Sequence, residues 1–333
     1  MNLPVSVVVP TCNRPEMLDR CLAALVVQRF DPSAYEILVV HDGALPGKGL
    51  AVQRIITRHA SRPNRPVIRY LPLRARTGPA AARNVGWRAA RGRVIAFTDD
   101  DCIPSPGWLQ AGLAAFTDGI AGVSGQVVMP LPDPLTDYAQ NAAGLTRSRF
   151  VTANCFYRRD VLAMVGGFDE RFHEAWREDS DLYFTILKHR DSHGRPLRLV
   201  DAPHAVVVHP VRPARWGISL QQQRKSYYNA LLYKKHPALY RYWLGPVTPW
   251  RYYAIAAAAL AALLALAGRR RLLAALAGGT WAVLTARFCR SRLHGTRKTP
   301  GHVAEMALTS FLIPFLSIFW RLRGAIRFGV FFL

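Results

Sequence analysis

The chain reads Val-Ile-Ala-Phe-Thr-Asp-Asp-Asp from residue 94 to residue 101, and this stretch indicates the fold class. Its four apolar residues predict a strand that is buried on both faces, as strands of parallel sheets are. The three carboxylates that follow repel one another, and a divalent cation would relieve that repulsion. Ligands of open α/β sheets bind beyond the carboxyl ends of the strands. We therefore expect a ligand site where this strand ends.

Short strands and helices alternate on both sides of this stretch. Apolar runs predict strands at residues 5–9, 36–40, 67–71, 94–97, 150–158 and 205–208. Apolar residues at helical spacing or of helix-forming type predict helices at residues 15–27, 53–59, 80–90 and 182–189. Such β-α-β-α alternation predicts a doubly wound α/β sheet.

Polar residues stand at the carboxyl ends of three predicted strands. Thr11 and Arg14 follow the first strand, Asp42 follows the second, and the Asp99–Asp101 triplet follows the fourth. Carboxylates two residues apart can face the same side of an extended strand end. Such oxygen ligands suit Mg²⁺ or Mn²⁺ bridging to substrate phosphates. The alternative is an acidic turn that only caps the next helix.

The charge of the chain favours a membrane partner. The 333 residues include 44 Lys or Arg and 21 Asp or Glu, a net charge of +23. Residues 246–333 hold 12 basic residues, one acid and three apolar runs at 252–268, 272–286 and 302–320. Nucleic-acid-binding tails are basic and polar, whereas a basic and apolar tail favours an anionic membrane. We expect an anionic membrane and no nucleic acid among the partners.

The length of the apolar runs leaves their placement open. Seventeen helical residues reach roughly 26 Å, slightly short of a ~30 Å hydrocarbon core. A membrane-spanning hairpin, interfacial helices and buried core helices all remain. The five dispersed cysteines form no CxxC pair, which argues against a disulfide framework and against a zinc site. A reducing, cytosolic setting fits this usage.

Five blocks of residues together resemble the family 2 (GT-A fold) glycosyltransferases of the membrane-associated bacterial type. The blocks are residues 5–14, 36–43, 78–86, 97–101 and 166–182. They cover about residues 3–210, and the apolar tail lies outside the resemblance. The implied fold is a GT-A-like mixed sheet with a nucleotide-sugar-binding half and an acceptor half, followed by membrane-associated helices.

The resemblance implies a nucleotide-sugar donor bound across the first half. Thr11, Arg14 and Asp42 would lie near the nucleoside, and Arg83, Asn84 and Asp100 also belong to the donor site. Asp99 and Asp101 would hold Mg²⁺ or Mn²⁺ on the diphosphate, with His209 as an additional ligand or a structural histidine. His41 departs from the family pattern, which often has an acid there.

Two acidic residues near the acceptor half are candidates for the catalytic base. Glu178 and Asp179 begin a predicted helix, whose dipole favours ionised carboxylates. A base must reach the acceptor hydroxyl, and we expect Asp179 in that role with Glu178 in support. The alternative is that the pair only caps the helix. Trp176 is expected either to stack on an acceptor sugar or to pack in the core.

These features predict a catalytic domain at residues 1–245 and a membrane-associated helical region at 246–333. The expected activity is inverting, metal-dependent sugar transfer to a glycan or lipid-linked acceptor, in cell-envelope polysaccharide or glycolipid synthesis. The expected location is the cytoplasmic membrane, with the catalytic domain facing the cytoplasm. Two rivals are a sugar-1-phosphate nucleotidyltransferase, whose Gly-rich basic signature the first loop lacks, and a non-catalytic glycan-binding scaffold.

Overall fold

The computed structural model describes residues 3–43, 48–245 and 248–332. It divides the chain into two compact units. Unit 1 comprises Met1–Pro130 and Gly144–Pro210, and unit 2 comprises Leu131–Ala143 and Val211–Leu333. Residue 246, where the predicted membrane region begins, lies outside the described residues. The boundary between a catalytic domain at residues 1–245 and a membrane region therefore stays a prediction.

Unit 1 is built on one mixed sheet of eight strands in the order β3-β2-β1-β4-β7-β6-β8-β5. The strands are β1 (Leu3–Thr11), β2 (Tyr35–His41), β3 (Val67–Pro72), β4 (Gly92–Phe97), β5 (Ile103–Pro104), β6 (Ile120–Val128), β7 (Cys155–Arg158) and β8 (Arg198–Val208). The β3-β2-β1-β4 half is parallel, whereas β7 runs antiparallel to both β4 and β6. The predicted α/β sheet is confirmed.

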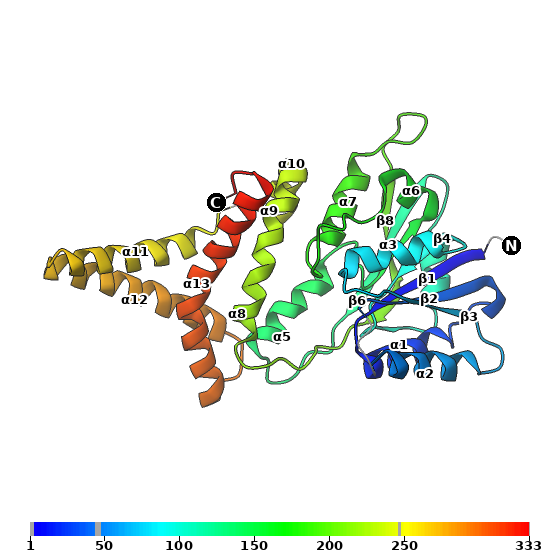
Figure 1. Cartoon of the computed structure of the whole chain (residues 1–333), viewed down its shortest axis with the longest axis horizontal. Helices are drawn as coiled ribbons and strands as arrows, with labels where there is room; N and C mark the ends of the chain where they lie inside the picture. The colour runs from blue at the N-terminus through cyan, green and yellow to red at the C-terminus, as the bar shows by residue number, and fades with distance from the viewer. Residues whose placement is uncertain (1–2, 44–47, 246–247, 333) are drawn as a thin grey trace. The chain divides into compact units, whose positions relative to one another are not determined.

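Helices cover both faces of the parallel half. They are α1 (Pro15–Leu25), α2 (Lys48–Ala60) and α3 (Pro79–Ala89), followed later in unit 1 by α4 (Trp108–Ala114), α6 (Arg159–Val165) and α7 (Glu178–Lys188). Helices α1 and α2 lie side by side on one face, and α3 lies on the other (Figure 1). A Cβ added at Gly86 would stand 2.4 Å from a methyl group of Val8, so glycine lets α3 approach the sheet closely.

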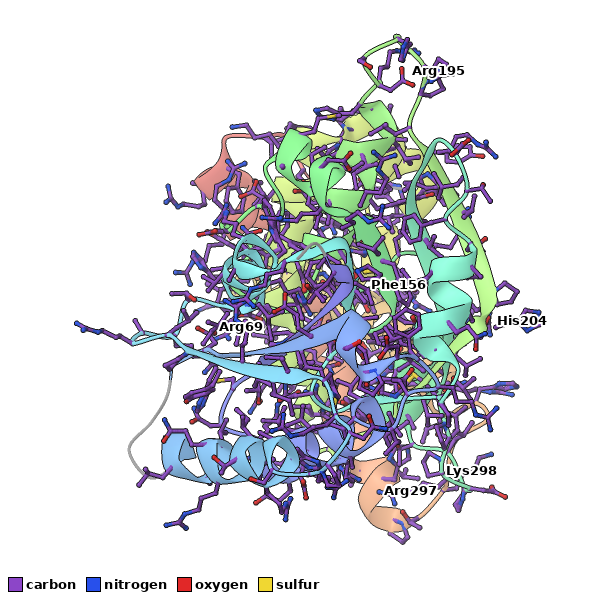
Figure 2. The ribbon with its side chains drawn as sticks, turned by 90° about the vertical axis from the view of Figure 1, so that its right-hand side faces the viewer. Arg69, Phe156, Arg195, His204, Arg297 and Lys298 are labelled. Carbon is purple, nitrogen blue, oxygen red and sulfur yellow. The ribbon has the colours of Figure 1, made fainter. Side chains whose placement is uncertain are left out.

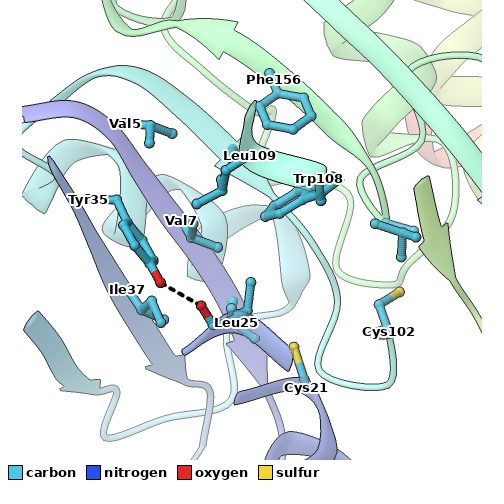
Figure 3. Packing of buried hydrophobic residues seen from close by; sticks show 14 of the residues in the cluster. Val5, Val7, Cys21, Leu25, Tyr35, Ile37, Cys102, Trp108, Leu109 and Phe156 are labelled. Carbon is cyan, nitrogen blue, oxygen red and sulfur yellow. Dashed lines mark hydrogen bonds between the residues drawn. The ribbon is translucent and has the colours of Figure 1, made fainter. Parts of the chain in front are cut away.

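The core under α1 is packed from residues of both halves of unit 1. Figure 3 shows Val5 and Val7 of β1 beside Ile37 of β2, with Trp108 of α4 and Phe156 of β7 in the same cluster. The hydroxyl of Tyr35 donates to the carbonyl of Leu25 at 2.8 Å, which satisfies its polar end inside the core.

A buried carboxylate ties the parallel strands together at their amino ends. Glu36 is 1% exposed and accepts hydrogen bonds from Ser6 Oγ and the Arg91 backbone N–H, both at 2.7 Å. Its second oxygen pairs with Arg69 of β3 at 3.2 Å, and Figure 2 shows Arg69 at this edge strand. Because both carboxylate oxygens of Glu36 have hydrogen-bonding or charged partners, the cost of burying this charge is offset.

The strand predictions for the part of the sheet after β4 need correction. Strand β6 (Ile120–Val128) and the short strand β5 were not predicted. The strand predicted at 150–158 begins only at Cys155, since Phe150 has a left-handed φ of 55°. Strand β8 begins at Arg198, seven residues before its predicted start, because its first half is partly exposed and has no apolar run.

Unit 2 is helical. It contains α5 (Asp137–Ala142), α8 (Ile218–Gln222), α9 (Ser226–Lys235), α10 (Pro237–Leu244), α11 (Trp250–Ala267), α12 (Arg271–Leu293) and α13 (Pro300–Phe328). Helices α11 and α12 lie side by side as a hairpin (Figure 1). Helices α11, α12 and α13 are each long and apolar enough to cross a membrane. In the most apolar windows of α11 and α12 only 6% of residues are buried, so their apolar side chains have little protein cover.

Helix α13 has the opposite polarity to a helix of a soluble core. Its exposed stripe includes Leu308, Phe311, Phe315, Phe319 and Leu322. Its buried face is largely polar or small and consists of His302, Met306, Thr309, Ser310, Ile313, Pro314, Ser317, Arg321 and Gly324. A soluble helix turns its apolar stripe inward. The outward apolar face is therefore suited to lipid.

A buried ion pair joins α5 to the long helices within unit 2. Arg292 of α12 donates Nε and Nη2 to the two oxygens of Asp137, at 3.2 and 2.7 Å. Its Nη1 donates to the hydroxyls of Thr309 and Ser310 on α13. Residues 131–143, inserted between β6 and β7 in the sequence, are thus fastened to the C-terminal helices.

Candidate active site

The parallel register brings the predicted polar strand ends to one edge of the sheet. Thr11 pairs with His41 across β1 and β2, and Val8 pairs with Phe97 across β1 and β4. The residues after His41 and Phe97 therefore emerge next to the end of β1. This edge collects the Thr11 loop, Asp42 and the acidic triplet.

The three carboxylates of the triplet have three different partners. Asp100 is buried, accepts from Thr11 Oγ1 at 2.7 Å, and pairs with Arg14 Nε at 3.0 Å. Burial raises the pKa of Asp100 to about 6, with Arg14 and Thr11 acting in the opposite direction. Asp100 thus joins the end of β4 to the loop after β1. Thr11 and Arg14, which were predicted to lie near the nucleoside, therefore both contact Asp100.

Arg83 links the acidic triplet to Glu178, the residue next to the predicted base Asp179. It lies on α3, is 2% exposed, and donates Nη2 to Asp99 at 2.7 Å and Nη1 to Glu178 Oε1 at 3.0 Å. Burial raises the pKa of Glu178, while the Arg83 guanidinium acts to lower it. Among the described residues, Glu178 Oε2 is buried and has no hydrogen-bond partner. That oxygen remains available to a ligand.

Asp179 stands beside Glu178 in the first turn of α7. Its Oδ1 accepts from the Ser180 backbone N–H at 2.6 Å, and its side chain is half-buried. Helix α7 begins at Glu178, four residues before its predicted start at Leu182, so both acids lie in its first turn. Trp176 is also half-buried, and the Arg177 guanidinium lies 4.6 Å from the centre of its ring. Arg177 itself has a left-handed φ of 75°.

Asp42 and Asn84 have structural partners. Asp42 accepts from the Thr77 backbone N–H at 2.6 Å and from the Gly78 N–H at 2.9 Å, which fastens the start of α3. The Asn84 amide donates to the Phe168 carbonyl and to Glu170, and its oxygen accepts from the Trp87 ring and the Phe168 N–H. These contacts use the full hydrogen-bonding capacity of the Asn84 amide.

His41 is the last residue of β2, and side chains on either side hold its ring. It is buried, its Nδ1 lies 3.0 Å from the Tyr70 hydroxyl, and its Nε2 lies 3.3 Å from Asn13 Oδ1. Burial lowers the pKa of His41, although neighbouring Asp42 opposes this.

The third carboxylate, Asp101, lies in a cluster of side chains that could bind a metal ion. Asp101, Cys102 and His209 each offer a ligand atom, and these atoms all lie within 4.8 Å of one another. His209 follows β8, and its Nε2 lies 3.7 Å from Asp101 Oδ2. The predicted set of Asp99, Asp101 and His209 is thus divided: Asp101 and His209 come together, whereas Asp99 contacts Arg83. Cys102 was not among the predicted site residues, although it directly follows the triplet.

Comparison with known proteins now identifies the domain. Residues 6–169 match the family model of glycosyl transferase family 2. The chain carries a family 2 glycosyltransferase domain. The glycosyltransferase is 29% identical to glycosyltransferase AglE of Haloferax volcanii over 229 residues, which cover 66% of this chain and 70% of that protein.

One further sequence relative and one solved structure are also similar to this chain. A pre-mycofactocin glycosyltransferase of Mycobacterium tuberculosis is 28% identical to our glycosyltransferase over 225 residues, covering 62% of this chain but 43% of that protein. A mannosyltransferase from Pyrobaculum calidifontis, solved with GDP-Man and Mn²⁺, aligns with a TM-score of 0.55 and 17% identity. That alignment covers 99% of this chain and 88% of the other. The GT-A-like fold and the expected resemblance are confirmed.

Proposed function

We propose that this glycosyltransferase moves a sugar, with inversion, from a nucleoside-diphosphate sugar to a glycan or lipid-linked acceptor. The observation that carries the proposal is the link through Arg83, which joins the acidic triplet to the Glu178–Asp179 pair at one edge of the sheet. A site of this kind has a cation-binding side for the leaving group and a carboxylate side for the acceptor.

The residues at the triplet fit a divalent cation, Mg²⁺ or Mn²⁺. Asp101 and His209 would hold it, and Asp99, two residues before Asp101, offers a further carboxylate. Such a cation neutralises the charge that develops on a leaving diphosphate. The fit rests on a carboxylate oxygen and an imidazole nitrogen that face each other at 3.7 Å.

On the donor side, this chain supplies cations and hydrogen-bonding groups for the nucleotide. We assign Thr11, Arg14 and Asp42 to the nucleoside end and Arg83 to the diphosphate end. Asp100 holds Arg14, and Asn84 holds the turn at Phe168, so we assign both a positioning part. Positioning of this kind reduces the entropy that the reacting groups must lose.

On the acceptor side, Asp179 would accept the proton of the attacking hydroxyl. The acceptor oxygen forms a bond to the anomeric carbon while the bond from that carbon to the diphosphate oxygen breaks. A single displacement of this kind inverts the anomeric configuration. Asp179 is half-buried and thus reachable, whereas Glu178 is fully buried against Arg83. Glu178 would support it with its remaining oxygen, and Trp176 would contact an acceptor sugar.

Unit 2 would hold the enzyme at the cytoplasmic face of the membrane, where a lipid-linked acceptor can be reached. The outward apolar face of α13 and the exposed hairpin of α11 and α12 support this. Basic residues between 287 and 298 favour the cytoplasmic side. Cell-envelope polysaccharide or glycolipid synthesis would use such an arrangement.

A binding and transfer assay tests the proposal. We expect nucleoside diphosphates with Mn²⁺ to raise the apparent Tm of the full chain in detergent, since a ligand at 100 times its Kd stabilises by about 2.7 kcal/mol. Membranes containing the protein should transfer label from a nucleotide sugar to glycan or lipid. Binding without transfer or hydrolysis would favour the scaffold, and pyrophosphate release from a sugar 1-phosphate and a nucleoside triphosphate would favour the nucleotidyltransferase.

The membrane arrangement has a separate test. An Arg270→Cys variant places a thiol at the turn between α11 and α12. Labelling of that thiol by an impermeant reagent from outside intact cells would mean that the hairpin spans. Protection would favour helices lying on the cytoplasmic surface.

A further inference from the structure

Cys102 stands where a thiol can reach the cation that the proposed function requires. Strand β5 pairs with β8 in antiparallel register, with Ile103 opposite Val208. One residue beyond that pair on each strand lie Cys102 and His209. The backbone N–H of His209 also donates to the Val128 carbonyl at 2.8 Å. The sheet itself therefore places these two side chains together.

The hydrogen bonds of His209 orient its ring as a ligand. Its Nδ1 lies 3.3 Å from the Pro210 carbonyl oxygen, which can only accept, so Nδ1 carries the proton. Nε2 then presents its lone pair toward Asp101 Oδ2, at 3.7 Å. Metal-binding histidines usually have this arrangement, with the second nitrogen donating to a carbonyl or carboxylate.

The spacing of the three ligand atoms is close to that around one cation. The Asp101 oxygen, Cys102 sulfur and His209 nitrogen lie within 4.8 Å of one another. Ligands bonded at 2.0–2.3 Å to a tetrahedral ion stand roughly 3.3–3.8 Å apart. A contraction of at most about 1.0–1.5 Å, within reach of side-chain rotation, would bring all three onto one ion.

We propose that Cys102 is a direct protein ligand of the metal in this glycosyltransferase and makes the site thiophilic. This inference rests on the proposed metal-dependent function. A set of one oxygen, one nitrogen and one sulfur suits Zn²⁺, Co²⁺ or Cd²⁺, and accepts Mn²⁺, but is poor for Mg²⁺. The absence of a CxxC pair, which argued against a zinc site, does not apply to ligands that meet through the sheet.

Binding involves a balanced exchange at the sulfur. The metal–sulfur bond forms, the S–H bond breaks, and the proton passes to the solvent buffer. Cys102 is buried, and its sulfur lies in the same group as the Asp101 oxygen and the His209 nitrogen.

Co²⁺ is the probe for this ligand because a thiolate bound to Co²⁺ gives a near-ultraviolet charge-transfer band. We expect the full chain in detergent to show this band on Co²⁺ addition. Cys102→Ala and Cys102→Ser should lose the band and bind Co²⁺, by equilibrium dialysis, at least ~10-fold more weakly. Cys21→Ala is the matched control, since Cys21 is equally buried and its thiol contacts the Asp99 carbonyl at 3.6 Å. The control should keep the band.

The outcomes separate the two proposals. Co²⁺ bound by the wild-type chain without a charge-transfer band would overturn the role of Cys102 and leave the metal-dependent function standing. A band that persists in Cys102→Ala, or that disappears in Cys21→Ala, would assign the thiolate elsewhere and also overturn the inference. Failure of the wild-type chain to bind Co²⁺ or Mn²⁺, with transfer unaffected by EDTA, would overturn both.

Discussion

Replacing Arg83 by methionine would leave two carboxylates without the guanidinium that both contact. Glu178 has a side chain that is 3% exposed, whereas that of Asp99 is 22% exposed, so the larger cost falls on Glu178. Removing one partner of a buried ion pair costs about 3–5 kcal/mol, because the other charge stays buried. At roughly 2–4 °C per kcal/mol for a domain of this size, the apparent Tm should fall by about 6–20 °C.

The loss of stability in Arg83→Met should depend on pH. Burial already raises the pKa of Glu178, and removal of the cation raises it further. The folded carboxyl then keeps its proton at pH values where the unfolded carboxyl has lost it. Stability consequently falls as pH rises from the unfolded to the folded pKa. The deficit should be smaller at about pH 5 than at about pH 8.

Thermal unfolding of the full chain in detergent, followed by fluorescence, measures these effects. The double variant Arg83→Met/Glu178→Gln should recover part of the loss, since the uncompensated charge is gone. Arg88→Met is the matched control, because Arg88 lies on the same helix and its pair with Glu170 is half-exposed. That control should change stability by less than ~1 kcal/mol. Equal deficits for Arg83→Met at both pH values and in the double variant would refute the reasoning.

Three further predictions concern the reaction and the helical unit. Asp179→Asn should keep donor binding and lower kcat by ~10²–10⁴, the usual worth of a general base, whereas a crippled Glu178→Gln beside a nearly normal Asp179→Asn would exchange their roles. Asp101→Ala should abolish transfer and Mn²⁺-dependent binding of the nucleoside diphosphate, and activity unchanged by EDTA would contradict the metal. Arg292→Met should cost about 3–5 kcal/mol by leaving Asp137 buried alone, and a double variant with Asp137→Leu should recover much of it; no recovery would mean that the pair is not coupled.

The sequence determined the features that depend on neighbouring residues. The first four strands, the three helices between them and the acidic edge follow from short apolar patterns, and the structure confirms each. The apolar runs that became α11, α12 and α13 were equally visible. Strand β6 was not predicted because its Ile120–Val128 stretch carries glycine, serine and glutamine among its apolar residues. Backbone pairing with β7 and β8 stabilises β6 as a strand, although its own sequence pattern does not predict one.

Only the tertiary structure decided where each acidic side chain points. Asp99, Asp100 and Asp101 are adjacent in sequence, yet they meet Arg83, Arg14 and His209 respectively. The backbone turns after β4, and adjacent residues of a turn project in different directions toward partners that come from distant parts of the chain.

Contacts between residues distant in sequence also explain why Cys102 belongs to the site and which face of α13 is polar. Cys102 meets His209 through the pairing of β5 with β8, a contact between residues far apart in sequence. Helix α13 reads as apolar by composition, but its polar face is defined only by what it packs against, including Arg292. Local sequence sets which groups are present, and non-local packing decides which of them meet and which face the surroundings.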